Sequence, residues 1–345
     1  MLKSLIKKEA LHILRDWRTV VIVLVMPVIL LLLFGFAISM EVNDVRVVMA
    51  VDAHSERSRR LAAAIDANPC FIFSGLVNER QIEPLMRGGR ADVALVGRNG
   101  RWQIIADASN PVIARSAAAY VSSVVAETAS PQPLAFTVHT LYNPSLRSAY
   151  NFVPGILGMI FILVCAIMTS VSIVSEKESG SMDMLLVSPA RPGLIILGKL
   201  IPYFILSCVL LALMLAISYI VLGLPFSAES LGSIILSLIY IVLSLSIGLL
   251  VSTLVATQLS ALIVSAMLFM IPVIMLSGMI FPIDNMPQPL QWISTIVPAR
   301  WYIEAMRRVM IQQLPLAAVW RELAMLGAMT LVLLSLAITK FRSRQ

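Results

Sequence analysis

The chain has 345 residues, of which 59% are hydrophobic and only 13% are charged, whereas a soluble domain carries about 25% charged residues. These values exclude a cytosolic enzyme and a disordered chain. The net charge of +7 is a feature of nucleic-acid-binding proteins, but here the basic residues gather at the chain ends and in one polar segment. We attribute them to membrane topology, and we expect a polytopic membrane protein with no nucleic-acid partner.

The first 18 residues are expected to form a cytoplasmic amphipathic helix. Apolar side chains recur at helical spacing from Leu2 to Trp17, with basic side chains and Glu9 between them. A basic amphipathic helix is typical of a segment that lies among lipid headgroups. The sequence therefore predicts an interfacial helix that contacts membrane lipids and orients the first span.

Six stretches are long and apolar enough to cross a bilayer, which takes about 20 helical residues. They are residues 19–39, 151–174, 200–222, 231–254, 260–281 and 323–340. They carry no Asp, Glu, Lys, Arg or His before Lys340, the last residue of the sixth. The fold class is therefore a polytopic α-helical membrane protein with six transmembrane helices, followed by a short tail over 341–345.

The basic residues of the short loops indicate the orientation, because cytoplasmic loops are enriched in Lys and Arg. Basic residues precede the first span, occupy the loop between the second and third spans, and follow the sixth span: Lys3, Lys7, Lys8, Arg15, Arg18, Lys177, Arg191, Lys199, Lys340, Arg342 and Arg344. The loop 223–230 has none. We therefore expect both termini in the cytoplasm, with the four arginines of 282–322 as a mild exception.

The segment 40–150 then lies outside the membrane, on the side opposite to the termini, and its pattern predicts a compact α/β domain. Short β-branched or aromatic runs at 45–51, 71–76, 91–96 and 102–106 are typical of strands. Asn78 is placed to cap a helix that ends at Gly88-Gly89, and Asn110-Pro111 is placed to open another helix reaching about Thr128. A last strand is expected at 134–138. This segment contains no catalytic set, so its role stays open between binding a substrate, binding a partner protein and acting as a spacer.

The cytoplasmic loop 175–199 is the most informative segment. A charged cluster, Glu176-Lys177-Glu178, ends the second span, and Gly180-Ser181 interrupts the helix. We expect a new short helix in which Asp183 lies in the first turn, Leu185 and Leu186 form an apolar face, and Ser188-Pro189 is the end. Such a helix suits docking into a groove of another protein, and a capped turn between two spans is the equally weighted alternative.

The same loop contains an incomplete nucleotide-binding motif. Gly193, Gly198 and Lys199 match the spacing of a P-loop, but Leu200 stands where the magnesium-binding Ser or Thr belongs. The stretch also enters an apolar span and does not link a strand to a helix. We therefore expect that this chain does not hydrolyse ATP.

The segment 282–322 is expected to be an extracytoplasmic loop with an amphipathic helix over about 299–312. Its prolines, among them Pro282, Pro287 and Pro298, prevent one continuous helix. Glu304 and Arg307 lie on the polar face of the amphipathic run. A helix resting on the outer surface of the membrane is one interpretation of this pattern.

Cysteine and histidine indicate neither a metal centre nor a disulfide framework. The six side chains are scattered along the chain: Cys70, Cys165, Cys208, His12, His54 and His139. None of them forms a cluster with the spacing of metal ligands.

The loop and several other motifs resemble the ABC-2 type permeases, the membrane subunits of many bacterial ABC exporters. The coupling segment of that family combines a Glu-basic-Glu cluster, Gly-Thr, an acidic residue, Leu-Leu and Ser-Pro. This chain matches with Glu176-Lys177-Glu178, Gly180-Ser181, Asp183, Leu185-Leu186 and Ser188-Pro189. Ser181 and Asp183 replace Thr and Glu and keep the hydroxyl and the charge. Motifs near the second and fifth spans also match, including Tyr142-Asn143-Pro144, Phe152-Val153-Pro154-Gly155 and Leu276-Ser277-Gly278.

The resemblance implies a function and a set of partners. Two such subunits, identical or paralogous, would form a pathway in the bacterial inner membrane, and a separate ATPase that holds ATP and Mg would bind each coupling segment. This chain would bind no cofactor and would not itself be an enzyme. The prolines Pro282, Pro287 and Pro298, with Glu304 and Arg307, would lie near the outer mouth as gate candidates. A periplasmic adaptor protein is a further possible partner.

Two other function classes compete with this interpretation. An ion-coupled transporter usually needs ionisable groups inside the membrane, and the predicted spans lack them. A membrane signalling or mechanical-relay protein with an outside sensor domain would also lack such groups, and it would work through a partner ATPase without transport. The spans are rich in Leu, Ile and Ser without a distinctive polar pocket, so a transported substrate is expected to be amphipathic or lipophilic, of the drug or lipid class.

Overall fold

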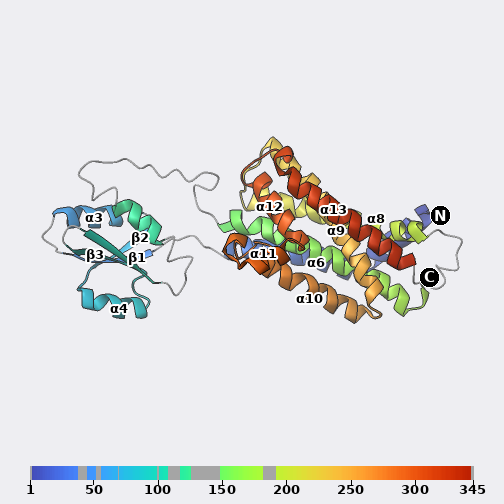
Figure 1. The fold of residues 1–345 in the computed structure, drawn as a ribbon, viewed down its shortest axis with the longest axis horizontal. Coiled ribbons are helices and arrows are strands. Elements are labelled where there is room, and N and C mark those ends of the chain that lie inside the picture. The colour runs from blue at the N-terminus through green and yellow to red at the C-terminus, as the bar shows by residue number, and fades with distance from the viewer. Residues whose placement is uncertain are drawn as a thin grey trace. The chain divides into compact units, whose positions relative to one another are not determined.

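The computed structural model describes residues 2–37, 45–51, 56–68, 70–98, 101–107, 117–125, 148–181 and 192–342. The chain divides into two compact units (Figure 1). One is formed by Met1–Ile38 and Ser148–Gln345, and the other by Ser39–Arg147. The first unit is helical, and the second contains a β-sheet.

The helical unit contains six helices that are long and apolar enough to cross a membrane, as the sequence predicts. They are α2 (Trp17–Ala37), α6 (Ser148–Glu178), α8 (Pro192–Ala216), α9 (Leu231–Leu254), α10 (Gln258–Leu276) and α13 (Trp320–Arg342), and α8 continues into the π-helix η1 (Ile217–Val221). A helix satisfies its own backbone hydrogen bonds, which is the condition for crossing a lipid core.

Two of these helices form the centre of the helical unit. In α6 and α9, 67% of the most apolar stretch is buried, against 11% in α2 and 17% in the stretch that includes α13. Small residues let the two central helices approach closely. A side chain at Gly248 of α9 would begin 2.6 Å from the carbonyl oxygen of Ala166 on α6. The tight α6–α9 contact therefore depends on this glycine.

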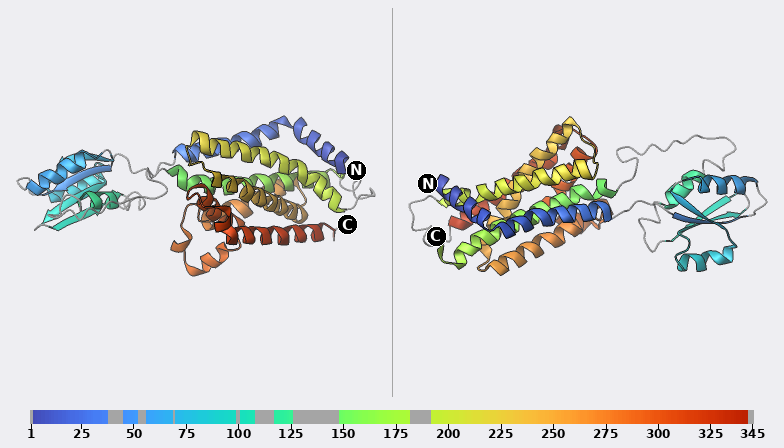
Figure 2. Two further views of the ribbon diagram at one scale, coloured as in Figure 1. Left: turned by 90° about the horizontal axis from the view of Figure 1, so that it is seen from above. Right: turned by 180° about the vertical axis from the view of Figure 1, so that it is seen from behind.

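A shorter helix, α1 (Leu2–Arg15), precedes the first span. The chain breaks at Asp16, whose carboxylate accepts a hydrogen bond from the backbone nitrogen of Thr19 at 3.4 Å and so caps α2. Hydrogen bonds from Thr19 lower the pKa of Asp16. α1 packs against α8 and, less extensively, against α2. All views place both chain ends at the same end of the helical unit, which fits an even number of spans (Figures 1 and 2).

Several short elements connect α10 to α13. They are the 3-10 turn η3 (Ile283–Asn285), α11 (Gln288–Ser294), α12 (Pro298–Met310) and the 3-10 turn η4 (Leu316–Val319). Prolines stand at or next to the first residue of α11 and α12, where the missing backbone N–H costs no hydrogen bond. Another 3-10 turn, η2 (Ala228–Ser230), leads into α9.

The second unit is built on a four-stranded sheet. The strands are β1 (Val45–Ala50), β2 (Phe71–Leu76), β3 (Val93–Arg98) and β4 (Arg101–Ala106), in the spatial order β2-β1-β3-β4. β1 is parallel to β2 and β3, and β4 is antiparallel to β3. These strands lie where the sequence predicts the first four; the predicted fifth strand, 134–138, lies outside the described residues.

Helices cover both faces of the sheet. α3 (Glu56–Asp66) and the helical residues 117–125 pack on one face through Leu61, Ile65 and Val121. α4 (Glu79–Arg87) packs on the other face through Ile82. Asn78 caps α4 as predicted, in a reciprocal arrangement with Gln81. The predicted helix start at Asn110-Pro111 lies outside the described residues.

Candidate functional site

The last turn of α6 carries three charged side chains that point to different neighbours. Successive residues of a helix are about 100° apart around its axis, so Glu176, Lys177 and Glu178 cannot share one face. Each of them contacts another helix of the unit. The three charges of the predicted cluster therefore do not share one surface, and each of them contacts a different part of the helical unit.

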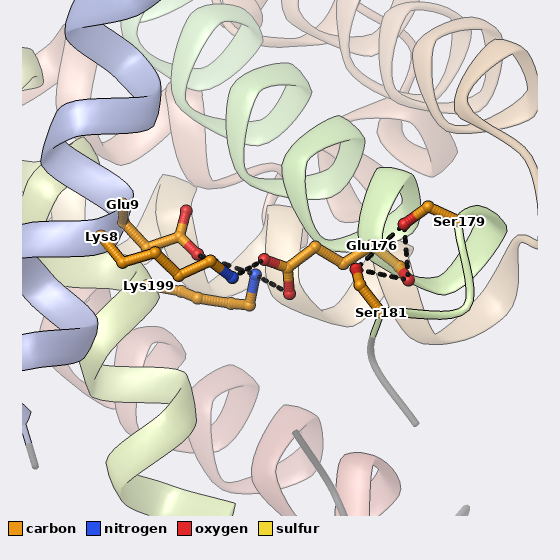
Figure 3. Close-up of polar contacts among 6 residues, drawn as sticks. All are labelled: Lys8, Glu9, Glu176, Ser179, Ser181 and Lys199. Atoms are coloured by element: carbon orange, nitrogen blue, oxygen red, sulfur yellow. Dashed lines mark hydrogen bonds and ion pairs between the residues drawn. The ribbon is translucent and has the colours of Figure 1, made fainter. Parts of the chain in front are cut away.

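Glu176 faces α1 and α8. Its Oε2 forms an ion pair with Nζ of Lys199 at 2.6 Å, and its Oε1 accepts a hydrogen bond from Nζ of Lys8 at 2.8 Å. Glu9 of α1 completes the group, with its Oε1 at 3.4 Å from Lys199 Nζ and 3.7 Å from Lys8 Nζ. Figure 3 shows the four side chains converging from three helices. We call Lys8, Glu9, Glu176 and Lys199 the charge cluster.

The charge cluster is largely removed from solvent. The side chains of Glu9 and Lys199 are each 5% exposed, and that of Glu176 is 16% exposed, whereas Lys8 is 49% exposed. A buried charge is costly unless an opposite charge accompanies it, and two lysines here balance two glutamates. Partial burial acts to lower the pKa of Lys8, but the hydrogen bond and charge of Glu176 raise it on balance.

The other two charges of the motif face α9 and α10. Lys177 Nζ donates a hydrogen bond to the carbonyl oxygen of Ser252 in the last turns of α9. Glu178 Oε2 accepts hydrogen bonds from the backbone nitrogen and Nε2 of Gln258, the first residue of α10, at 3.2 and 3.0 Å. A cation at a helix C-terminus and an anion at an N-terminus both oppose the helix dipole favourably. The motif thus joins the end of α6 to four other helices.

The helix α6 ends directly after this motif. α6 ends at Glu178, and Gly180 has a φ of +72°, a conformation that favours glycine. The hydroxyls of Ser179 and Ser181 donate to the carbonyl oxygen of Glu176 at 3.2 and 3.3 Å and satisfy the helix end (Figure 3). The other predicted docking residues lie outside the described residues: Asp183, Leu185, Leu186, Ser188 and Pro189.

The residues of the incomplete nucleotide-binding motif have another explanation. Gly193, Gly198 and Lys199 all lie within α8, so no phosphate-binding loop exists there. A side chain at Gly198 would begin 2.9 Å from Cβ of Leu5 on α1. Gly198 therefore allows the two helices to touch, and Lys199 beside it belongs to the charge cluster.

Sequence reasoning did not identify Glu9 and Lys199 as site residues. One signal for Glu9 was available, because it lies on the apolar stripe of α1 that includes Leu5, Ile6 and Ile13. An acidic residue on the packed face of a basic helix needs a buried cation. The identity of that cation, 190 positions away in the chain, has no local signature.

The outer gate candidates lie around α12, and this helix is buried. Seven of its residues are inaccessible or nearly so: Ala299, Tyr302, Ile303, Ala305, Met306, Val309 and Met310. α12 packs against α6, α9 and α13. The interpretation of this segment as a helix resting on the outer membrane surface is therefore wrong. An amphipathic pattern also arises when one face of a helix packs on protein.

Tyr302 of α12 packs against the two central helices, α6 and α9. Its ring stacks on Tyr240 of α9, with centroids 4.2 Å apart, and meets the edge of Phe161 on α6 at 6.4 Å. The Tyr302 hydroxyl and Ser237 share a hydrogen bond of 2.8 Å, and the Tyr240 hydroxyl donates to the carbonyl oxygen of Gly158 at 3.0 Å. Phe161 lies within the apolar span Phe152–Glu178, about 14 Å from its first residue along the helix.

The charged gate candidates do not form one group. Arg308 bridges Glu304 at 2.7 Å and Glu322 of α13 at 3.0 Å. Arg307 turns away and donates to the carbonyl oxygen of Gly278 at 3.4 Å. The prolines Pro282 and Pro287 are exposed, and Pro298 begins α12. Arg308 and Glu322, which fasten α12 to α13, were not among the predicted gate residues.

The second unit has a cleft of about 640 Å³ between α4 and strands β3 and β4. Its lining includes the apolar Ile82, Val96 and Ile105, and its rim includes Glu83 and Arg87, which pair at 2.7 Å. Among the residues that the structure describes, no group of His, Cys, Asp and Glu is placed to hold a metal ion.

Comparison with known proteins identifies relatives along nearly the whole chain. A family model described as ABC-2 family transporter protein matches residues 17–339. The probable multidrug ABC transporter permease YbhR of Escherichia coli K12 is 30% identical over 362 residues, covering 99% of this chain and 98% of the relative. The permease YbhS of the same strain, with the same description, is 28% identical over 331 residues, covering 90% and 88%. The inner membrane transport permease YhhJ is 27% identical over 208 residues, covering 58% and 54%.

Proposed function

Because the chain belongs to the ABC-2 family of transporter proteins, we propose that it is the membrane-spanning permease subunit of an ATP-driven exporter. A separate ATPase, carrying ATP and Mg, binds the loop 175–190. The site residues of this docking surface are Glu178, Asp183, Leu185, Leu186 and the turn residues Gly180, Ser181, Ser188 and Pro189. Glu176 and Lys177 act from within the bundle.

The observation that carries this proposal is the set of contacts at the end of α6. A chain without a nucleotide site uses ATP energy only through a contact surface, and a loop transmits force only if its ends are fastened to the elements that must move. Glu176 ties the loop to α1 and α8, and Lys177 and Glu178 tie it to α9 and α10. A push on the loop would therefore reach most of the bundle.

The remaining features follow from this assignment. The distribution of basic residues supports a topology with the two termini and the loop 175–199 in the cytoplasm of a bacterium whose inner membrane holds the protein. In this topology the sheet-containing unit is extracytoplasmic and is where a periplasmic adaptor protein would bind. α1 lies among cytoplasmic headgroups. Two permease copies, identical or paralogous, form the pathway, and α12 controls its outer end.

The substrate class is amphipathic or lipophilic, as in drugs and lipids. The described spans bury serine and tyrosine hydroxyls, with Ser170–Ser265 and Ser237–Tyr302 as examples of paired hydroxyls. The buried charges Glu176, Lys199 and Glu322 lie within the first or last three turns of their helices and are ion-paired. Such a lining offers apolar surface and few polar contacts. Two relatives are described as probable multidrug permeases, which supports the same class for this chain.

The decisive test combines the chain with its candidate ATPase in liposomes. ATP-dependent uptake of ethidium is followed by its fluorescence on entrapped DNA, with ATPase subunits facing outward. Asp183→Lys and Leu185→Glu should each abolish co-purification of the ATPase and ethidium uptake. Arg59→Gln, an exposed residue of α3 in the second unit, is the control and should change neither. If both loop variants still bind the ATPase and transport at the rate of the unmodified protein, the docking assignment is wrong.

A further inference from the structure

The accessible side of α12 is rich in arginine. One face of this helix is buried in the bundle, whereas five residues at helical spacing are only partly buried: Arg300, Trp301, Glu304, Arg307 and Arg308. We call these five residues the cationic stripe, because it combines three arginines with a single glutamate. The sequence of 282–322 already stands out for its four arginines, since basic residues favour the opposite side of the membrane.

Arg300 has no ion-pair partner among the described residues. Its Nη1 donates hydrogen bonds to the carbonyl oxygen of Gln291, at 3.0 Å, and to the hydroxyl of Ser294, so it satisfies the end of α11. A guanidinium carries five N–H donors, and the Nε of Arg300 is buried without a hydrogen-bond partner in the part of the chain that the structure describes. The described partners are neutral, so they do not balance the positive charge.

Arg307 resembles Arg300 and lies two helical turns further along α12. Its Nη2 donates to the carbonyl oxygen of Gly278 at 3.4 Å, and its Nε is buried and unbonded as far as the described residues extend. Glu304 attracts Arg307, but that carboxylate is bonded to Arg308 at 2.7 Å. A partly buried cation is costly unless an anion accompanies it. Both arginines can therefore accept a negative group from outside the chain.

The surroundings of the cationic stripe are those of a membrane–water interface. α11 and α12 lie at the end of the helical unit that is opposite to both chain termini (Figures 1 and 2). Three of the five tryptophans of the chain lie in this part: Trp292, Trp301 and Trp320. Tryptophan gathers at the level of the lipid headgroups. Trp292 is 71% exposed and Trp320 is 65% exposed, and Ile293 and Ile296 beside Trp292 are exposed as well.

We propose that Arg300 and Arg307 bind the phosphate groups of anionic phospholipids, in the leaflet at the end of the helical unit opposite to the chain termini. The lipid phosphates supply the negative charge that the described side chains lack, and a phosphate accepts two parallel hydrogen bonds from one guanidinium. The acyl chains cover Trp292 and the isoleucines next to it. This inference goes beyond the proposed function and uses neither transport nor the ATPase.

The test is a lipid titration of the full chain in detergent, followed by thermal unfolding. The probes are phosphatidylglycerol, phosphatidylcholine and inorganic phosphate, and the apparent affinity is the probe concentration at half of the rise in melting temperature. We expect phosphatidylglycerol to raise the melting temperature, and the zwitterionic lipid and free phosphate to have little effect. An equal rise with phosphatidylcholine would overturn the role of charge, and an equal rise with inorganic phosphate would overturn the assignment to a lipid.

Removal of either arginine locates the site. Arg300→Gln and Arg307→Gln should each weaken the apparent affinity for phosphatidylglycerol about fivefold, which is the contribution of one basic residue at a charged lipid surface. Arg321→Gln is the matched control, because it removes the same charge from an exposed position of α13 at the same end. It should change the affinity less than twofold. If Arg321→Gln weakens binding as much as Arg307→Gln does, the attraction is a diffuse charge effect and the site is overturned.

Glu304→Gln tests the site in the opposite direction. It removes the one negative charge of the cationic stripe and frees Arg308 from its pair with Glu304, so phosphatidylglycerol should bind more tightly. A purely structural role of the stripe predicts no gain in lipid affinity when this ion pair is lost. Unchanged or weaker binding would overturn the inference. This variant also decides the question if Arg300→Gln, which loses the bonds to α11, does not fold.

Hydrogen exchange shows where the lipid acts. Phosphatidylglycerol should slow the exchange of residues 288–310 in the unmodified protein and should slow it less in Arg307→Gln. Equal slowing in both proteins would overturn the inference. The proposed function is tested separately, by docking of the ATPase and by transport, so a failure of the lipid site leaves it intact.

Discussion

Glu176 and Lys199 form an ion pair of 2.6 Å between the last turn of α6 and the third turn of α8. The 22 positions between them contain all of the proposed docking loop that follows Glu176, which is residues 177–190. The pair therefore closes the loop at its base. Because Lys8 and Glu9 join the same contact, the base of the loop is a four-charge cluster that also holds the N-terminal helix.

Replacement of Glu176 by Gln should destabilise the helical unit. It leaves Lys8 and Lys199 with Glu9 as their remaining described acidic partner, and breaking a buried ion pair from one side costs about 3 kcal/mol. Thermal unfolding in detergent measures the loss. Glu56→Gln, which breaks the exposed pair with Arg60, is the control and should cost less than about 0.5 kcal/mol. Equal melting temperatures for the two variants would show that the cluster does not contribute to stability.

Gly248→Ala should weaken the contact between α6 and α9. The new methyl group would lie 2.6 Å from the carbonyl oxygen of Ala166. This oxygen belongs to the backbone of α6, so it cannot move aside as the end of a flexible side chain can. Overpacking of this kind costs about 1–3 kcal/mol. Gly327→Ala on α13 is the matched control, because nothing lies within 4 Å of that position; it should gain up to about 1 kcal/mol from helix propensity. Unfolding in detergent distinguishes the two, and a stabilised Gly248→Ala protein would contradict the close approach.

Tyr302→Phe should loosen α12 without removing its ring. The substitution removes the hydrogen bond between the Tyr302 hydroxyl and the buried hydroxyl of Ser237. We expect this loss to lower the free energy of unfolding by about 1 kcal/mol. Tyr302→Ala also removes the stack on Tyr240 and should cost about 3–5 kcal/mol. Hydrogen exchange over residues 298–310 should rise in that order. If hydrogen exchange over residues 298–310 is as slow in both variants as in the unmodified protein, Tyr302 does not hold α12 in the bundle.

Arg308→Gln should release α12 from α13. Glu322 is 6% exposed at its side chain and would keep a buried charge after losing Arg308, its ion-pair partner at 3.0 Å. Because Arg308 is 38% exposed, solvent screening reduces the cost to about 2 kcal/mol. Adding Glu322→Gln should restore part of the loss, since the uncompensated charge disappears. Arg321→Gln, at an exposed neighbouring position, should be neutral; a double variant less stable than Arg308→Gln would contradict the ion pair.

The elements of this protein are predictable because their determinants are local. The six apolar helices follow from uninterrupted runs without charge, since such a segment is stable only where water is absent. The four described strands follow from short β-branched runs, and Asn78 shows that a single capping residue marks a helix start. The end of α6 is also predictable, because glycine commonly ends a helix. Gly180 does so here with a positive φ, a conformation that other residues rarely adopt.

Contacts between distant residues have no such local signal. The pairing of Glu9 with Lys199 joins positions 190 apart in the chain, and the sequence around each residue is compatible with exposure to solvent. The burial of α12 is similar, because Tyr302 and Ile303 would form the same amphipathic stripe against lipid or against protein. The sequence shows the Glu176-Lys177-Glu178 motif, but it does not predict that Glu176 faces inward.

By itself, then, the amino-acid sequence determined that this chain has six apolar helices, an inserted segment with strands and the loop motif of an ABC-2 permease, because composition and periodicity act over neighbouring residues. Only the tertiary structure decided that Lys8, Glu9, Glu176 and Lys199 meet and that α12 lies inside the bundle. The physical reason is that a charge buried by packing must find its partner among whichever helices the fold brings together, and that choice is made by the whole chain.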